Sequence, residues 1–147
     1  MGMETCLQTS ISTNIEIYDT NGLICKTSNT LTNKGRSIIG QLLLSNKKID
    51  SVILSEEENT GATQLMPNDA VYLDIINYYS TISNTTGELT INIETSADVS
   101  TTGSITLNSI GLAMGDVLFS VANAGGIALG SNPISILYQI KIKLTQL

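Results

Sequence analysis

The chain has 147 residues, a length that suits one compact domain, and its 7 basic and 13 acidic side chains give a net charge of −6. It contains no histidine, which excludes a Ser-His-Asp triad, a Cys-His pair and any histidine ligand for a metal. Ser, Thr and Asn account for 47 residues, a composition that favours a scaffold or adhesive surface over an active site.

Neither nucleic acid nor a membrane is an expected partner. The basic residues occur as isolated pairs, such as Lys34 with Arg36, whereas binding to DNA or RNA needs a basic stripe. No apolar run reaches the length of about 18 residues that spans a membrane, and residues 1–6 lack the pattern of a signal peptide. Cys6 and Cys25 are expected to be free thiols made in a reducing cytoplasm, with a bridge between them as the alternative.

Apolar and polar residues alternate from Ile11 to Ile17, which predicts a first strand. The segment Asp19-Thr20-Asn21-Gly22 predicts a hairpin turn of type I′, because Asn and Gly tolerate the positive φ that both central positions need. A second strand is expected from Leu23 to Ser28.

A short helix is predicted over residues 32–44, where the alternation stops. Thr32 can cap its N-terminus, whereas Gly35 and Gly40 each weaken it by about 1 kcal/mol relative to alanine. We therefore expect the helix to be stabilised by packing on a sheet. The apolar residues at helical spacing are Ile38, Ile39, Leu42 and Leu43.

Six further strands complete a mainly-β pattern. About eight strands and one short helix predict an antiparallel β-sandwich with the helix across one edge or end. A single domain is expected over residues 1–147, with residues 1–8 as an N-terminal arm. The six strands are expected at Lys48–Ser55, Ala70–Ile82 with a bulge near Ile76-Asn77, Leu89–Ile93, Ser104–Met114, Val117–Asn123 and Ile134–Leu144, with a hairpin turn at Gly115-Asp116.

Two acidic groups are candidates for metal binding or catalysis. Glu56-Glu57-Glu58, with Asn59 and Asp69, offers oxygen ligands for Ca²⁺ but lacks the spacing of an EF-hand, so a solvated loop is expected. Glu88, Glu94 and Asp98 are candidates for an acid/base pair in glycoside hydrolysis. Glu88 and Glu94 lie about 20 Å apart along one strand face, beyond the working distance of roughly 5–9.5 Å, so solvent-facing charges are expected.

The glycines between Gly125 and Gly130 do not form a phosphate-binding loop, because no Lys-Ser or Lys-Thr follows and no strand-to-helix context is present. A flexible loop between two strands is expected instead. The sequence therefore predicts no catalytic residue, no metal site and no cofactor, and the protein is not expected to be an enzyme.

The tyrosines leave two interpretations open. They could form a platform for sugar rings, which makes a carbohydrate-binding module one alternative and a surface glycan its partner. Tyrosines in strands also cap a core with the hydroxyl group at the surface. The residues concerned are Tyr72, Tyr78, Tyr79 and Tyr138, with Tyr18 beside the first turn.

The segment Leu31-Thr32-Asn33-Lys34-Gly35-Arg36 is similar to a T-N-x-G-R helix start, and Ile110 to Val121 is similar to an E-I-G-L-F…G-x-L-F-A hairpin. In these motifs, and over Leu31 to Leu144 as a whole, the chain resembles a bacteriophage virion domain of tail-fibre, baseplate and head-appendage proteins. The strands Ile49–Leu54 and Ile136–Leu144 also match. The chain departs from the pattern at Ser55, Ser109 and Ala113. The resemblance implies a structural role without catalysis.

The favoured function is a non-enzymatic structural protein of a tailed bacteriophage, most of all a capsid decoration or head-appendage protein on the outer surface. A lone acidic domain rich in Ser, Thr and Asn, without a long repetitive shaft, suits a solvent-facing coat. A tail-fibre or baseplate connector domain is the alternative. The expected location is the virion, after synthesis in the host cytoplasm, and the expected partners are the major capsid protein or tail and baseplate proteins.

A homo-oligomer is expected because several leucines are not matched to a single buried face. Leu42–Leu44 make the helix apolar on more than one side, and Leu137 and Leu147 lie on the polar side of the last strand. Uncovered apolar surface of this kind marks contacts between subunits, so a dimer or trimer is expected. The alternative is a helix buried on both sides by the sheet and the N-terminal hairpin.

Overall fold

The chain folds into two antiparallel sheets that face each other, which confirms the predicted mainly-β sandwich with one longer helix. The computed structural model describes residues 7–28, 30–44, 48–129 and 133–146. Strands hold 64% of the residues. The described residues form ten strands instead of about eight, because one predicted strand divides in two and a two-residue strand is added.

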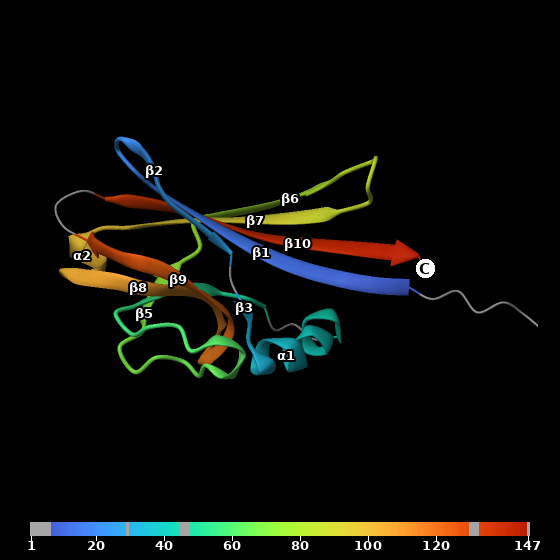
Figure 1. The fold of residues 1–147 in the computed structure, drawn as a ribbon, viewed down its shortest axis with the longest axis horizontal. Helices are drawn as coiled ribbons and strands as arrows, with labels where there is room; N and C mark the ends of the chain where they lie inside the picture. Colours follow the sequence, from blue (N-terminus) through green and yellow to red (C-terminus); the bar gives the residue numbers. More distant parts are fainter. Residues whose placement is uncertain (1–6, 29, 45–47, 130–132, 147) are drawn as a thin grey trace, which may run out of the picture.

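The longer sheet, sheet A, has the strand order β2-β1-β10-β7-β6. Figure 1 shows β1 and β10 running beyond the end of the other sheet, on the side where the helix lies. This projecting part of sheet A is called the overhang below. The strands are β1 (Leu7–Asp19), β2 (Gly22–Ser28), β6 (Asn77–Ile82), β7 (Leu89–Ala97) and β10 (Ile134–Gln146).

The shorter sheet, sheet B, has the strand order β3-β9-β8-β4-β5. Helix α1 (Asn33–Leu44) lies beside its end, and the one-turn helix α2 (Val99–Thr102) leads into β8 (Figure 1). A 3-10 turn covers Gly61–Thr63. The strands are β3 (Thr30–Leu31), β4 (Ser51–Ser55), β5 (Val71–Asp74), β8 (Ile105–Met114) and β9 (Val117–Leu129).

The main core lies between the two sheets and follows from the alternation along each strand. In sheet A, Ile15, Tyr138 and Ile93 are opposite one another across three strands, so their side chains share the inner face. Sheet B meets them with Leu54 and Leu112. All five residues are buried, which explains why the alternating segments of the sequence became strands of a sandwich.

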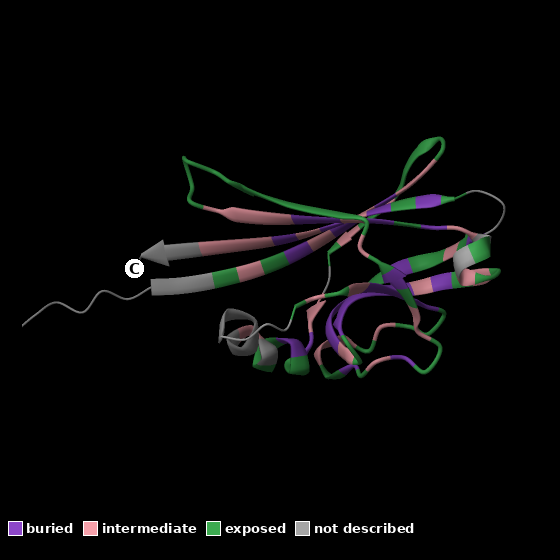
Figure 2. Ribbon diagram, turned by 180° about the vertical axis from the view of Figure 1, so that it is seen from behind, coloured by how far each residue is buried: buried purple, intermediate pink, exposed green. Residues whose placement is uncertain are grey.

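Sheet B is buried on both faces, so its central strands do not alternate. The segment 56–70 covers the outer side, where Ile53, Ala113, Leu118 and Val121 form a second small core with Met66 and Ala70 packed against it. Every residue from Ile110 to Met114 and from Leu118 to Ala122 is therefore buried, and Figure 2 shows these strands mostly in purple. Strands covered on both sides read as nearly continuous apolar runs.

The predicted long strand Ala70–Ile82 is wrong. The chain leaves sheet B after Asp74 and joins the opposite sheet as β6, so Ile75 and Ile76 connect two sheets instead of forming a bulge. Ile75 packs against the main core, whereas Ile76 is exposed and its N–H donates to the carbonyl oxygen of Glu94, 2.9 Å away. Apolar and polar residues alternate in the same way within one long strand and within two short strands that belong to different sheets. The sequence pattern therefore did not reveal the change of sheet.

The flexible loop predicted around Gly125 is also wrong, because β9 continues through it to Leu129. Gly125 and Gly126 have φ of 77° and 78°, values that glycine reaches without a steric penalty, and the pairing of β8 with β9 is irregular at this point. The glycines therefore form a bulge within a strand. Gly130 lies outside the described residues.

The first hairpin turn differs from the predicted type I′. Asp19 pairs with Gly22, so Thr20 and Asn21 are the central residues, and no described residue other than glycine has a positive φ. The N–H of Asn21 donates to a carboxylate oxygen of Asp19, 2.7 Å away. Gly22 takes the positive φ of 124° at the position after the turn.

Tyr138 lies at the centre of the sandwich, fully buried, and its hydroxyl group shares a hydrogen bond with Ser120 of the opposite sheet. Burial disfavours the phenolate and raises the pKa of Tyr138 far above the ordinary value of 10.0. The folded state therefore holds this proton at a pH where the unfolded chain releases it.

Replacing Tyr138 with phenylalanine is expected to change the response of stability to alkali. In the parent protein, the contribution of Tyr138 to the free energy of unfolding is fully present below pH 10. Above pH 10 it falls by up to about 1.4 kcal/mol per pH unit, because the hydroxyl group of Tyr138 ionises in the unfolded chain before it ionises in the folded one. Tyr138→Phe is expected to lose about 1 kcal/mol near neutral pH from the missing hydrogen bond, and to show a shallower decline above pH 10. Urea unfolding between pH 7 and 11 measures both effects. If the free energy of unfolding falls equally steeply with pH above 10 in the two proteins, Tyr138 is not the buried group that causes the decline.

Candidate functional site

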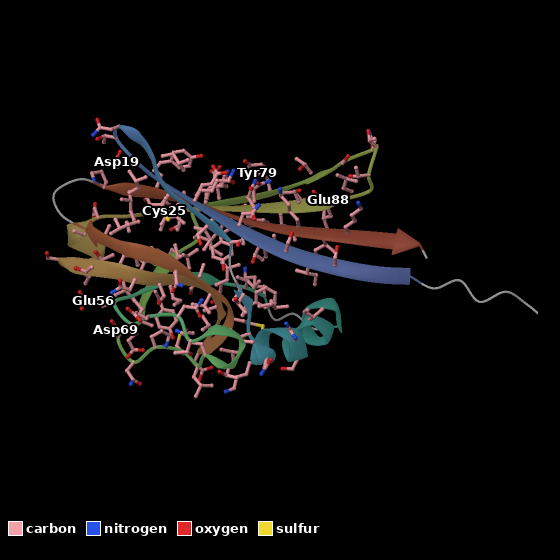
Figure 3. All side chains as sticks on the ribbon, in the orientation of Figure 1. Asp19, Cys25, Glu56, Asp69, Tyr79 and Glu88 are labelled. Atoms are coloured by element: carbon pink, nitrogen blue, oxygen red, sulfur yellow. The ribbon has the colours of Figure 1, made fainter. Side chains whose placement is uncertain are left out.

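The acidic loop uses its carboxylates to hold itself against sheet B. Asp69 accepts hydrogen bonds from the hydroxyl group of Ser55 at 2.6 Å and from the N–H of Glu56 at 2.9 Å, and Glu56 accepts the N–H of Thr106 at 2.8 Å. Figure 3 shows Glu56 and Asp69 together beside sheet B. Glu57 and Glu58 are exposed, as expected of a solvated loop. Among the described residues no group of three or more acidic or cysteine side chains is arranged to hold a metal.

The second acidic group does not come together either. Glu88 lies just before β7 and Asp98 just after it, so a strand length on the order of 30 Å separates them. Glu94 lies between them and faces outward, opposite Leu137 and Asn77. Figure 3 shows Glu88 in the overhang, far from the acidic loop.

The tyrosines occupy different faces of the sandwich, so they do not build a common platform. Tyr72 pairs with Ile53 and lies on the outer side of sheet B, whereas Tyr138 is in the core. Tyr78 lies opposite Ile93 on the inner side of sheet A, and its neighbour Tyr79 lies on the outer side. Tyr18 donates to the carboxylate of Glu16, and this bond raises the pKa of Tyr18.

Of the two cysteines, only Cys25 lies within the described residues, where it is a free thiol. Cys25 is half-buried in β2, and its thiol lies 3.8 Å from the carbonyl oxygen of Ala124. Burial raises the pKa of Cys25, so this thiol is protonated at neutral pH and is a poor nucleophile. Cys6 lies outside the described residues.

Helix α1 begins where predicted and is tied to β9 by its first residues. The hydroxyl group of Thr32 accepts the N–H of Gly35 at 2.9 Å, which is an N-cap, and donates to the carbonyl oxygen of Leu118 at 2.6 Å. The N–H of Thr32 donates to the carbonyl oxygen of Phe119 at 3.0 Å. Thr32 thus caps the helix and fastens it to the sheet with one fully buried side chain.

Two glycines of the resembling segments are required by close packing. A Cβ atom on Gly35 would lie 2.0 Å from the carbonyl oxygen of Phe119, so only glycine lets the helix approach β9 this closely. A Cβ atom on Gly111 would lie 2.4 Å from the carbonyl oxygen of Ser120 and 2.9 Å from Leu118. Thr32 and Gly35 therefore make up a helix–sheet joint at Leu118 and Phe119 of β9, and Gly111 lets β8 pack closely on the adjacent part of the same strand.

An apolar groove of about 650 Å³ lies under the overhang of sheet A. Its walls are mostly apolar and offer burial to an apolar side chain. The sequence did not reveal it, because residues from four separate segments meet only in the folded chain. The groove is lined by Ile91, Ile93 and Ile140 of sheet A, by Tyr78 at the free edge, and by Ile49 and Ile75 opposite; Lys48, Asp50 and Asp74 also contribute.

Of the leucines predicted to mark subunit contacts, Leu137 lies within the described part of the chain. Leu137 lies on the outer side of sheet A, as predicted, where it is half-buried in a depression of about 410 Å³ shared with Tyr18 and Ile76. Leu42–Leu44 belong to α1, but their side chains, like the whole of Leu147, lie outside the described residues.

Within the described part of the chain, neither helix is long and apolar enough to cross a membrane. Comparison of the chain with models of protein families, with curated proteins and with solved structures finds no match.

Proposed function

We propose that the chain is a non-enzymatic structural protein of a tailed bacteriophage particle, placed on the outer surface of the head as a decoration or head-appendage protein. The observation that carries the proposal is the role of the residues shared with virion domains. Thr32 and Gly35 serve the helix–sheet joint, and Gly111 serves the close packing of β8 on β9, so all three have an architectural role. Residues of the resembling segments that serve the packing of the fold are consistent with a structural protein.

The outer side of sheet A supports a position facing solvent. It carries amide, hydroxyl and charged side chains, with Gln139 donating to the side-chain oxygen of the buried Asn92 at 2.8 Å. Among the described residues, the ion pair that joins Lys26 to Glu16 at 4.0 Å on this side is weak. The net charge of −6 opposes contact with packaged DNA. The partners in this proposal are the major capsid protein or the tail and baseplate proteins.

The resembling hairpin at Gly111-Leu112 also favours a second position, a tail-fibre or baseplate connector domain. Both positions use the same fold, so they differ in where the protein is found and in how many copies a particle contains. A head lattice repeats its surface sites many times, whereas a tail ring is closed by a few subunits.

In purified particles, the protein is expected to remain with DNA-filled heads after the tails are removed. Its copy number, measured by gel densitometry against the major capsid protein of the same sample, is expected to be on the order of a hundred or more. Recovery only with tails, in the small number set by one ring, would reject the head position and support the connector. Absence from both fractions would reject the virion proposal.

A further inference from the structure

The free edge of sheet A is an uncharged strand with every side chain exposed. Tyr78, Ile82 and Tyr79 are 75%, 67% and 45% exposed, and Figure 2 shows β6 in green along its length. The 13 residues from Ile75 to Gly87 contain no charged side chain and no proline. Edge strands are ordinarily protected from pairing by lysine, proline or a bulge, and β6 has none of these.

The other three sheet edges carry a charged side chain, are very short, or both. Lys26 lies within β2, which forms the opposite edge of sheet A. Sheet B ends in β3, with two residues, and in β5, with four residues that include Asp74. Of the four edges, β6 alone is both six residues long and uncharged.

The hydrogen bonds to β7 determine which backbone groups of β6 are available. Ser83 donates its N–H to the carbonyl oxygen of Glu88, and the pairing of β6 with β7 continues in regular register from this point. Backbone groups of an antiparallel strand alternate between its two neighbours. Tyr78, Ser80 and Ile82 therefore direct their N–H and C=O groups away from β7, toward the open edge.

We propose that β6 pairs antiparallel with β6 of a second copy of the chain, about a two-fold axis at Ser80. In this register Tyr78 lies opposite Ile82 of the partner subunit, and Ser80 lies opposite Ser80 of the partner subunit. All three open positions then form hydrogen-bonded pairs, with about six backbone hydrogen bonds in total. Sheet A becomes one ten-stranded sheet in which each exposed aromatic ring meets a β-branched side chain on the same face.

Symmetry selects a second copy as the occupant, and the lack of charged side chains along β6 permits it. Two molecules with a net charge of −6 repel each other, and β6 is an edge at which they can meet without bringing like charges together. The two most exposed large hydrophobic side chains of β6, Tyr78 and Ile82, are equally far from Ser80 along the strand, so a two-fold axis matches each to the other. The inference is independent of the proposed function, because it concerns association in solution.

Charge substitution at Ser80 tests both the surface and the register, because Ser80 faces its own copy. The parent protein is expected to sediment at twice the 15.6 kDa chain mass. Ser80→Lys and Ser80→Glu are each expected to weaken the dimer on the order of tenfold or more, because like charges lie directly opposite. An equimolar mixture of the two variants is expected to form a heterodimer, a rescue that variants unable to fold would not show.

A disulfide provides an independent measurement of the register. In a Cys6→Ser, Cys25→Ser background, Ser80→Cys is expected to form a covalent dimer on oxidation, since the paired Cα atoms lie about 5.5 Å apart. The matched control is Ser83→Cys, whose two copies lie roughly 20 Å apart in the same register and are expected not to bridge. A parent protein that stays monomeric at millimolar concentration, a dimer that Ser80→Lys leaves intact, or bridging by Ser83→Cys instead of Ser80→Cys would overturn the proposal.

Discussion

Replacing Gly35 with alanine is expected to destabilise the protein by about 3 kcal/mol or more, at the upper end of the cost of inserting one methyl group into a packed interior. The added Cβ atom would lie 2.0 Å from the carbonyl oxygen of Phe119. Backbone atoms cannot rotate away as a side chain can, so the first turn of α1 must move off β9. That movement also breaks the hydrogen bonds of Thr32 to Leu118 and Phe119.

The midpoint and slope of urea unfolding measure this effect. Arg36→Ala is the matched control, since Arg36 is the next residue of the same helix and is exposed. It is expected to change stability by no more than about 0.5 kcal/mol. A Gly35→Ala protein as stable as the control would show that α1 does not pack on β9 as closely as described here.

Replacing Gly111 with alanine is expected to cost about 3 kcal/mol of stability by crowding β9 from the neighbouring strand β8. The added Cβ atom would lie 2.4 Å from the carbonyl oxygen of Ser120 and 2.9 Å from a methyl group of Leu118. Leu118 and Ser120 are buried, so neither has room to move without disturbing the core. Thermal unfolding measures the loss.

Gly87→Ala separates steric crowding from the general cost of losing a glycine. Gly87 has a φ of 69° in an exposed turn, and nothing lies within 4 Å of an added Cβ atom. Only backbone strain remains there, so a cost of about 1–2 kcal/mol is expected. Equal losses for Gly87→Ala and Gly111→Ala would argue against the close contact with Ser120.

The helix–sheet joint shows how far sequence reasoning reached. Thr32 was identified as a cap because threonine before a helical pattern has a local role that sequence displays. Gly35 was interpreted only as a residue that weakens the helix, because its partner, Phe119, lies 84 positions away in the chain. The contact exists only after β9 is placed beside α1.

The candidate surfaces were the least predictable part of the molecule. Tyr78 and Tyr79 are adjacent in sequence, which leaves a common platform open, but successive residues of a strand point to opposite faces. The open edge of β6 was hidden inside what the alternation predicted as one long strand. An edge strand is one that lacks a hydrogen-bonded strand on one side. Which strands pair depends on residues far apart in the sequence, so the sequence alone did not show that β6 is an edge.

The amino-acid sequence by itself determined helix α1 and most of the strands, because alternation, capping and turn residues act within a few positions of one another. It determined the mainly-β class and the boundaries of α1 to within one residue. Only the tertiary structure decided which sheet each strand joins, that β8 and β9 are covered on both faces, and that β6 is left as a free edge. Those features arise from contacts between segments that are distant along the chain. A local sequence pattern does not show which distant segments will lie side by side, so it does not predict these features.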